Sequence, residues 1–218
     1  MPLPNRIIPL PNPDKVFHES WSPGRNLLNI PHPFRAVFLG PPNSGKSTVV
    51  KNILMRADPP FKAVVIVHCD SLYTQEYKDV DNCIMLDRIP APEEWPGDRK
   101  MLVILEDLEF KGMDKKQKQS LDRLFGYVST HKNISVCLCA QDAFNVPPCV
   151  RRCSNLFVLW RCPDMDSANL VARKAGLTAK KLNGLFDQHC PGPKDSVWID
   201  LSDHTPAKIR INGFTTIK

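Results

Sequence analysis

The residues most able to do chemistry lie in one short stretch, GPPNSGKST at residues 40–48. It fits the pattern G-x-x-x-x-G-K-[S/T], in which the backbone N–H groups of a tight glycine-rich turn point inward and cradle phosphate. An apolar run precedes the stretch and a helical pattern follows it, so the positive N-terminal end of a helix adds to the anion site. The residues predicted to contact a nucleotide are Gly40, Pro41, Pro42, Asn43, Ser44, Gly45, Lys46, Ser47 and Thr48.

Two side chains of this loop carry specific expectations. Lys46 is long enough to reach the β and γ phosphates of ATP, and the Ser47 hydroxyl can hold Mg²⁺. The alternative is a chance glycine-rich turn. The strand predicted before the loop and the helix predicted after it supply the context that the motif requires. We therefore expect ATP and Mg²⁺ to bind here.

A second candidate group is an acid pair at the end of LVILED, where four apolar residues lead to Glu106 and Asp107. Ligands of α/β sheets bind at the C-terminal edge of the strands. We expect Glu106 to share the Mg²⁺ site with Ser47, and Asp107 to orient or deprotonate the attacking water. Two alternatives stay open: exchanged roles within the pair, and two solvated carboxylates without a catalytic role. Glu109 is a further candidate.

The remaining candidates follow the strand pattern ISVCLCAQ, which ends in Gln141. A polar side chain at the tip of a neighbouring parallel strand can sense the γ-phosphate or its water; the alternative is an amide that caps the next loop. Arg151 and Arg152 follow a proline turn, and an arginine in such a loop can act on the γ-phosphate of a neighbouring subunit. The alternative function of these two arginines is surface charge or DNA contact. Arg123 and Arg161 are alternative residues for the role of the trans arginine. The predicted catalytic residues are therefore Lys46, Glu106, Asp107, Gln141, Arg151 and Arg152.

Apolar strand patterns alternate with helical patterns along most of the chain, which is typical of a mostly parallel sheet with helices on both faces. Predicted strands cover residues 34–40, 61–70, 82–89, 100–110, 134–141, 155–162, 195–201 and 207–214. Predicted helices cover 46–57, 113–131, 166–176 and 178–188, with a short helix or turn at 73–79. In the helix at 113–131, Asp114 and Gln117 resemble a capping box. The last two strands are candidates for an antiparallel hairpin.

Proline clusters divide the chain into two parts. MPLPNRIIPLPNPD begins the sequence and indicates an extended, partly polyproline-like arm. We therefore expect a Pro-rich arm at residues 1–30 and a P-loop ATPase domain at residues 31–218. A second proline-rich stretch, IPAPEEWPGD, indicates a loop.

Composition limits the class of protein. The chain has 218 residues, 24% charged residues and a formal net charge of +6, which permits a polyanionic partner without requiring one. No secretory signal and no apolar run as long as a membrane span is visible, so we expect no membrane-spanning segment and free thiols. Convergence of five residues on a metal ion is an alternative: Cys149, Cys153, Cys162, His189 and Cys190.

Four segments in this order resemble a known family. They are GPPNSGKST, LVILEDL, STHKNISVCLCAQDAFNVPPCVRRCSNLFVLWR and LFDQHCPGPKDSVWIDL. They resemble the genome-packaging ATPases of poxvirus-like large DNA viruses, Polinton-like viruses and their kin, in the FtsK–HerA superfamily of P-loop NTPases. The resemblance covers roughly residues 33–205, and its most specific part runs from His131 to Arg152.

The resemblance implies a RecA-like core in which Lys46, Glu106 and Gln141 are the P-loop lysine, the Walker B acid and the sensor. It implies a homo-oligomeric ring, hexameric or pentameric, that hydrolyses ATP and drives double-stranded DNA into a capsid, with a capsid protein or the portal region as partner. The place of action would be inside the host cell, in the nucleus or cytoplasm where virions assemble, or with the virion itself. Two departures are the Glu-Asp order of the acid pair and the lead-in Thr130-His131-Lys132, where the family has Arg-His.

DNA contacts of such a motor go to phosphates, independent of sequence. Lysines 111, 115, 116 and 118 are candidates for them; the alternative is the solvated face of a helix. Three other functions stay open: a P-loop ATPase that remodels protein or nucleic acid in another process, a nucleotide-binding scaffold without hydrolysis, and a kinase.

Overall fold

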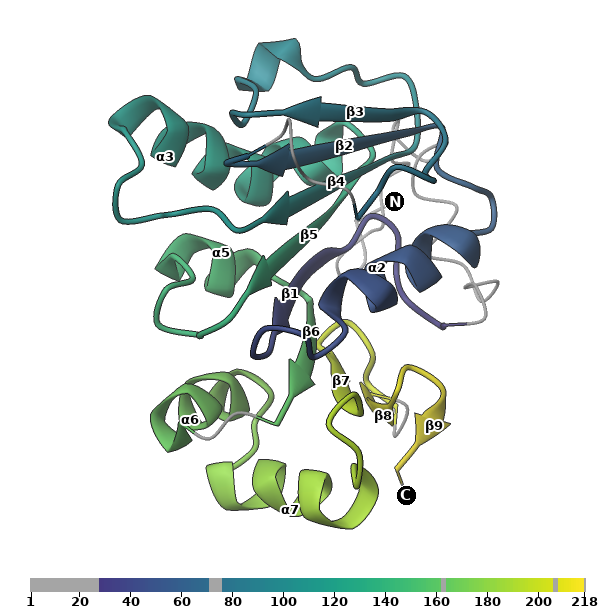
Figure 1. Cartoon of the computed structure of the whole chain (residues 1–218), viewed down its shortest axis with the longest axis vertical. Helices are drawn as coiled ribbons and strands as arrows, with labels where there is room; N and C mark the ends of the chain where they lie inside the picture. The colour runs from purple at the N-terminus through teal and green to yellow at the C-terminus, as the bar shows by residue number, and fades with distance from the viewer. Residues whose placement is uncertain (1–27, 71–75, 162–163, 206–207, 218) are drawn as a thin grey trace, which may run out of the picture.

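The computed structural model describes residues 28–70, 76–161, 164–205 and 208–217, and these residues form one nine-stranded sheet covered by helices (Figure 1). The strands are β1 (Arg35–Leu39), β2 (Ala63–His68), β3 (Cys83–Leu86), β4 (Met101–Glu106), β5 (Ile134–Ala140), β6 (Leu156–Trp160), β7 (Ser196–Asp200), β8 (Ile209–Ile211) and β9 (Thr215–Thr216). The helical elements are α2 (Lys46–Met55), η2 (Pro92–Glu94), α3 (Lys115–Arg123), η3 (Leu124–Val128), α4 (Ser129–His131), α5 (Pro148–Cys153), α6 (Met165–Lys174) and α7 (Ala179–His189).

The order of the strands is β3-β2-β4-β5-β1-β6-β7-β8-β9. Strands β1 to β6 pair in parallel, whereas β7, β8 and β9 each pair antiparallel with the strand before them. This confirms the predicted α/β class, including the antiparallel strands at the C-terminal end. Because β5 lies between β1 and β4, the carboxyl ends of these three strands adjoin one another at one edge of the sheet.

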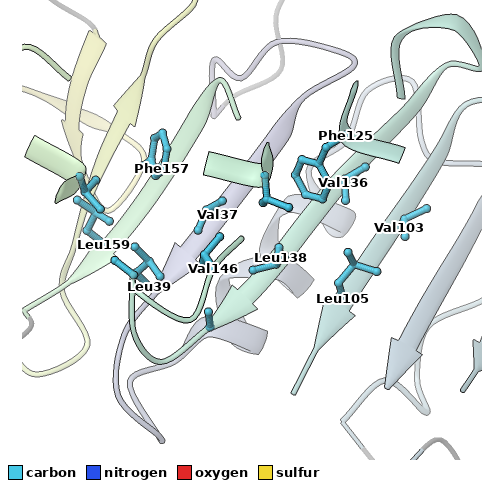
Figure 2. Close-up of a cluster of buried hydrophobic side chains, with 14 of the residues drawn as sticks. Val37, Leu39, Val103, Leu105, Phe125, Val136, Leu138, Val146, Phe157 and Leu159 are labelled. Atoms are coloured by element: carbon cyan, nitrogen blue, oxygen red, sulfur yellow. The ribbon is translucent and has the colours of Figure 1, made fainter. Parts of the chain in front are cut away.

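Both faces of the central strands are buried, which explains their continuous apolar sequences. In β1, Val37 and Leu39 belong to one apolar cluster and Ala36 and Phe38 to the other. Figure 2 shows the first cluster, in which the side chains of alternate residues from β1, β4, β5 and β6 gather on one face. This face packs against α3, η3, α5, α6 and α7, whereas α2 covers the opposite face through residues such as Val50 and Ile53.

The helix predicted at 113–131 forms with one irregularity. Residues 115–131 are helical throughout, but the stretch Leu124–Val128 is π-helical. Asp114 caps α3 by accepting a hydrogen bond from the backbone N–H of Gln117 (2.8 Å), as predicted. The reciprocal half of the capping box does not form. The Gln117 amide instead accepts from the Ile89 N–H (2.8 Å) and donates to the Ile89 carbonyl (3.1 Å), fixing the loop before η2.

The segment that carries Arg151 and Arg152 is a short helix, α5, and the prediction of a loop at these residues was wrong. The two prolines before it suggested a turn. Pro148 is instead at the first turn of the helix, where the missing N–H costs no hydrogen bond and the fixed φ suits a helix. Among the other differences, η2 and β9 were not predicted, and β8 is shorter than expected.

The described part of the chain begins at Leu28. The side chains of Leu28 and Ile30 are buried in the cluster that contains α2, and Arg210 donates a hydrogen bond to the Asn29 carbonyl (3.1 Å). Residues 1–27, which make up most of the predicted arm, lie outside the described part of the chain.

Close packing at the end of β1 requires glycine. A Cβ atom on Gly40 would lie 2.8 Å from Ser44 Oγ and 2.9 Å from Trp160 Cβ, closer than such atoms approach. The Trp160 side chain is 2% exposed and cannot easily move away. The first residue of the glycine-rich loop therefore rests directly on β6.

We predict that Gly40→Ala lowers the free energy of unfolding by about 1–3 kcal/mol, because it overpacks this contact. The matched control is Gly184→Ala in α7, where a Cβ atom has nothing within 4 Å. This control should gain up to about 1 kcal/mol from helix propensity. Chemical denaturation of both variants measures the difference, and equal effects of the two substitutions would contradict the packing account.

Candidate functional site

A cavity of about 550 Å³ opens at the sheet edge where the carboxyl ends of β1, β4 and β5 adjoin. The residues that line it are Pro42, Asn43, Gly45, Lys46, Ser47, Thr48, Lys51, Glu76, Glu106, Asp107, Cys139, Gln141 and Lys194. The predicted lysine, serine, acid pair and glutamine therefore meet in one place, although they are spread over 96 positions of sequence (46 to 141). Gly40, Pro41 and Ser44 belong to the same loop but do not line the cavity.

The glycine-rich loop has the conformation of an anion cradle. Gly45 has a φ of 101°, which favours glycine, and it precedes α2 without any side-chain cap or acidic residue in the first turn. The Lys46 ammonium donates hydrogen bonds to the carbonyls of Gly40 (2.8 Å) and Pro41 (2.9 Å), curling over its own loop. Ser44 Oγ is buried and has no hydrogen-bond partner among the residues that the structure describes. A phosphate group fits this cradle, because it would satisfy both the uncapped helix end and the lysine.

Glu106 is the buried acid of the site, with only 5% of the residue exposed. Its Oε1 accepts hydrogen bonds from Tyr77 (2.8 Å) and from the Ser47 hydroxyl (3.3 Å). Burial raises the pKa of the Glu106 carboxyl above its usual range, while the hydrogen bond from Tyr77 acts in the opposite direction. The direct contact between Ser47 and Glu106 places the two predicted Mg²⁺ ligands together, with oxygen donors that suit this ion.

Asp107 lies beside Glu106 but in a different environment. Neighbouring residues of a strand point to opposite faces, yet both acids line the cavity. The reason is that β4 ends at Glu106 and the chain turns at Asp107 with a φ of 48°. The Asp107 side chain is 66% exposed, and its Oδ2 lies 3.5 Å from Nε2 of His68 at the end of β2. The His68 Nδ1 accepts the N–H of Asp70 (2.9 Å), which leaves Nε2 as the protonated nitrogen of a neutral ring.

The other predicted residues are divided between the cavity and other parts of the surface. Gln141 follows β5 and lines the cavity, as its sensor role requires, although the role itself stays a prediction. Arg151 and Arg152 do not line it. The Arg151 guanidinium donates to the Ala143 carbonyl (2.7 Å), and Arg152 is exposed beside a second cavity of about 480 Å³ between the α3 and α5 regions. Among the residues that the structure describes, the cavity wall contains no arginine.

The alternative candidates lie elsewhere. Arg123 is exposed on α3, and Arg161 pairs with Asp187 (2.7 Å). Glu109 is exposed and does not line the cavity. The lysines at 111, 115, 116 and 118 are all exposed around the start of α3, so both interpretations of them stay open.

Sequence analysis missed four residues that line the cavity, Lys51, Glu76, Cys139 and Lys194, and also Tyr77, which contacts Glu106. Lys51 is four positions after Ser47, so helical spacing could have placed it on the same face. Glu76 and Tyr77 lie in the segment predicted as a short helix or turn at 73–79; residues 76–79 form a turn and 73–75 lie outside the described residues. The prediction did not place either side chain at the site. Lys194 precedes β7, and its position depends on the antiparallel pairing of that strand with β6.

The described residues show no group of three or more His, Cys, Asp or Glu side chains that could hold a metal ion, and Cys162 of the predicted cysteine cluster lies outside them. The described cysteines are all free thiols. In the same part of the chain, no helix is both long enough and apolar enough to cross a membrane.

No protein-family model matches the sequence, and no curated protein is significantly similar to it. Solved structures are similar in fold. The genome packaging NTPase B204 from Sulfolobus turreted icosahedral virus 2, in complex with AMPPCP, has a TM-score of 0.57 at 13% identity and covers 82% of this chain and 96% of that chain. The DNA-packaging ATPase B204 from Sulfolobus turreted icosahedral virus has a TM-score of 0.56 at 14% identity, covering 86% and 99%.

A third similar structure is the pCW3 conjugation coupling protein TcpA in its monomer form with ATPγS. Its TM-score is 0.56 at 13% identity, and the match covers 78% of this chain and 58% of TcpA. Likeness at such low identity establishes the fold. The chain therefore has a P-loop NTPase fold, with its glycine-rich loop and buried acid at the edge where this fold places them.

The burial of Glu106 gives a prediction for stability. Because the folded-state pKa lies above that of the unfolded chain, the folded state binds the proton more tightly, and stability falls as the pH rises through the folded pKa. Glu106→Gln should therefore have a higher Tm than the wild type near pH 7.5, without nucleotide or Mg²⁺, and the difference should shrink towards about pH 4.

The matched control is Glu109→Gln, which changes an exposed carboxylate three positions away. This variant should stay within about 0.5 kcal/mol of the wild type at both pH values. Thermal unfolding across the pH range measures both. If Glu106→Gln is less stable than the wild type near pH 7.5, the hydrogen bonds of Glu106 contribute more to stability than its burial costs.

Proposed function

We propose that this protein is an ATP-hydrolysing motor that moves double-stranded DNA, and that its task is to package viral DNA into a capsid. The observation that carries the proposal is the meeting of Lys46, Ser47, Glu106 and Gln141 in one cavity at the edge of this sheet. The similar folds of a DNA-packaging ATPase and a conjugation coupling protein support the motor function. The sequence resemblance to poxvirus-like and Polinton-like ATPases supports the viral task.

The residues of the cavity divide the work of hydrolysis. Lys46 would exchange the carbonyls of Gly40 and Pro41 for the phosphates, while Ser47 and Glu106 hold Mg²⁺. When bound, Mg²⁺ neutralises charge on the phosphate oxygens. Asp107, exposed and beside His68, is the carboxylate available to orient or deprotonate water. Gln141 faces the same space and can report the presence of the γ-phosphate to the loop that follows it.

The cavity needs an arginine from outside, because its described wall contains none. Arg151 is held by the Ala143 carbonyl, in the loop after Gln141. The Arg152 guanidinium makes no hydrogen bond or ion pair with the described residues and is exposed. We therefore assign Arg152 to the cavity of a neighbouring subunit and Arg151 to the position of the sensor loop. A head-to-tail contact of this kind generates a closed ring when the rotation between subunits closes, and we propose a ring of six or five subunits.

DNA and capsid complete the proposal. The net charge of +6 and the exposed lysines around the start of α3 suit sequence-independent contacts with phosphates. The ring would act with a capsid protein or portal region inside the host cell, or on the virion. A P-loop ATPase serving another process and a nucleotide-binding scaffold are the competing functions, and hydrolysis assays separate all three.

The direct test is steady-state ATP hydrolysis by the purified chain, with and without double-stranded DNA. We expect turnover that rises several-fold with DNA and disappears in Lys46→Ala, because this variant lacks the phosphate-binding ammonium. DNA-independent turnover would favour the competing ATPase function. ATP binding and assembly without turnover would favour the scaffold and overturn the catalytic roles of Glu106 and Asp107.

Mixing of subunits tests the assignment of Arg152. Arg152→Ala and Lys46→Ala should each lose at least about 10-fold in activity, since a trans arginine contributes 10³-fold or more in known cases. An equal mixture should regain up to about a quarter of the wild-type rate, because some interfaces then combine an intact loop with an intact arginine. Arg123→Ala is the control and should keep full activity. Co-assembly without recovery would show that Arg152 does not act in trans.

A further inference from the structure

Two lysines of the cavity, Lys51 and Lys194, have no part in the mechanism above. Lys194 lies in the turn before β7, yet it lines the same cavity as the glycine-rich loop. Because β7 runs antiparallel to β6, its N-terminal end lies at the edge where the parallel strands have their carboxyl ends. The strand order then places β1 between two flanks: β5 and β4 with the acids on one side, β6 and β7 with Lys194 on the other.

The turn that carries Lys194 is fixed to the fold. The indole N–H of Trp160 donates to the Lys194 carbonyl (3.1 Å), and the same tryptophan packs against Gly40 at the start of the glycine-rich loop. The Asp195 carboxylate accepts from the Gly192 N–H (2.8 Å) and from the Asn212 amide (2.9 Å). A single buried side chain, Trp160, thus connects the phosphate cradle with the lysine turn, so their separation is set by the sheet.

The three lysines of the cavity wall differ in what they contact. Lys46 is occupied by loop carbonyls, and the Lys51 ammonium lies 5.9 Å from the centre of the Tyr77 ring. The Lys194 ammonium makes no hydrogen bond or ion pair with the described residues and is exposed to the cavity. It is therefore the cation that can take an anionic partner without losing a contact.

We propose that Lys194 binds the polyphosphate chain of the nucleotide from the β7 side, as a second cationic contact within the same subunit. This inference rests on the proposed function of the cavity. A nucleoside triphosphate carries more negative charge than Mg²⁺ and Lys46 together neutralise, and Glu106, the acid that would hold the metal, lies at the end of β4. Lys194 supplies the missing positive charge on the opposite flank, where the described wall contributes no carboxylate.

The test is equilibrium binding by titration calorimetry on the full chain, with Mg·ATP and with inorganic tripolyphosphate, at about 50 mM salt so that screening is weak. Lys194→Gln should weaken both ligands by about five-fold, as expected for one exposed charge pair. Lys194→Arg keeps the charge and should stay within about two-fold of the wild type. The matched control is Lys180→Gln, an exposed lysine on α7 outside the cavity, which should bind like the wild type.

Three results would overturn the inference. In the first, Lys194→Gln binds both ligands as tightly as Lys180→Gln does. In the second, it loses affinity for ATP alone, which would mean that Lys194 contacts the base or sugar. If Lys46→Ala loses binding while Lys194→Gln does not, the proposed function survives and only this inference fails. If the wild-type chain binds neither ligand, both fail. Thermal unfolding of each variant confirms that the compared proteins are folded.

Discussion

A carboxylate buried at the end of β4 is the constraint on which the site depends. Glu106 is kept out of water by the sheet, so its charge is costly unless a cation or hydrogen-bond donor faces it. The hydroxyls of Tyr77 and Ser47 meet this need by donating hydrogen bonds to Glu106. We propose that a site arranged in this way holds Mg²⁺, because the ion would compensate the buried charge more strongly than two hydroxyls do. We infer that the burial of Glu106, which lowers stability, serves the function of the site.

The strand order explains how the glycine-rich loop comes to lie beside side chains from several different strands. Insertion of β5 between β1 and β4 brings Gln141 between the phosphate cradle and the acid pair. On the other side, Trp160 supports Gly40 and holds the turn of Lys194. We propose that changes at the γ-phosphate act first on the β5 side, where the loop after Gln141 leads through Ala143 to Arg151 and the helix α5. In the proposed ring, this route would connect the state of one cavity with the arginine that acts on the next.

Much of this architecture could be predicted from sequence, and the remainder could not, for physical reasons. Continuous apolar runs marked the buried strands, and the glycine-rich motif placed Lys46 and Ser47, because these signals are local. Local rules were ambiguous for Arg151, since prolines begin helices as readily as they form turns. The position of Lys194 depends on the pairing of β7 with β6, and that of Tyr77 on the contact between its turn and Glu106. A single sequence does not encode either of these as a pattern. Gln117 shows the same limit: its capping motif was correct at Asp114, but the side chain found a distant partner in Ile89.

The central claim is that hydrolysis in this cavity moves DNA, and strand displacement tests it most directly. The measurement follows release of a labelled third strand from a triplex at one end of a long duplex, with ATP or a non-hydrolysable analogue. The account predicts release with ATP at a delay that grows with duplex length, and no release with the analogue or with Glu106→Gln. Release that stays absent while DNA-stimulated hydrolysis proceeds at full rate would contradict the account.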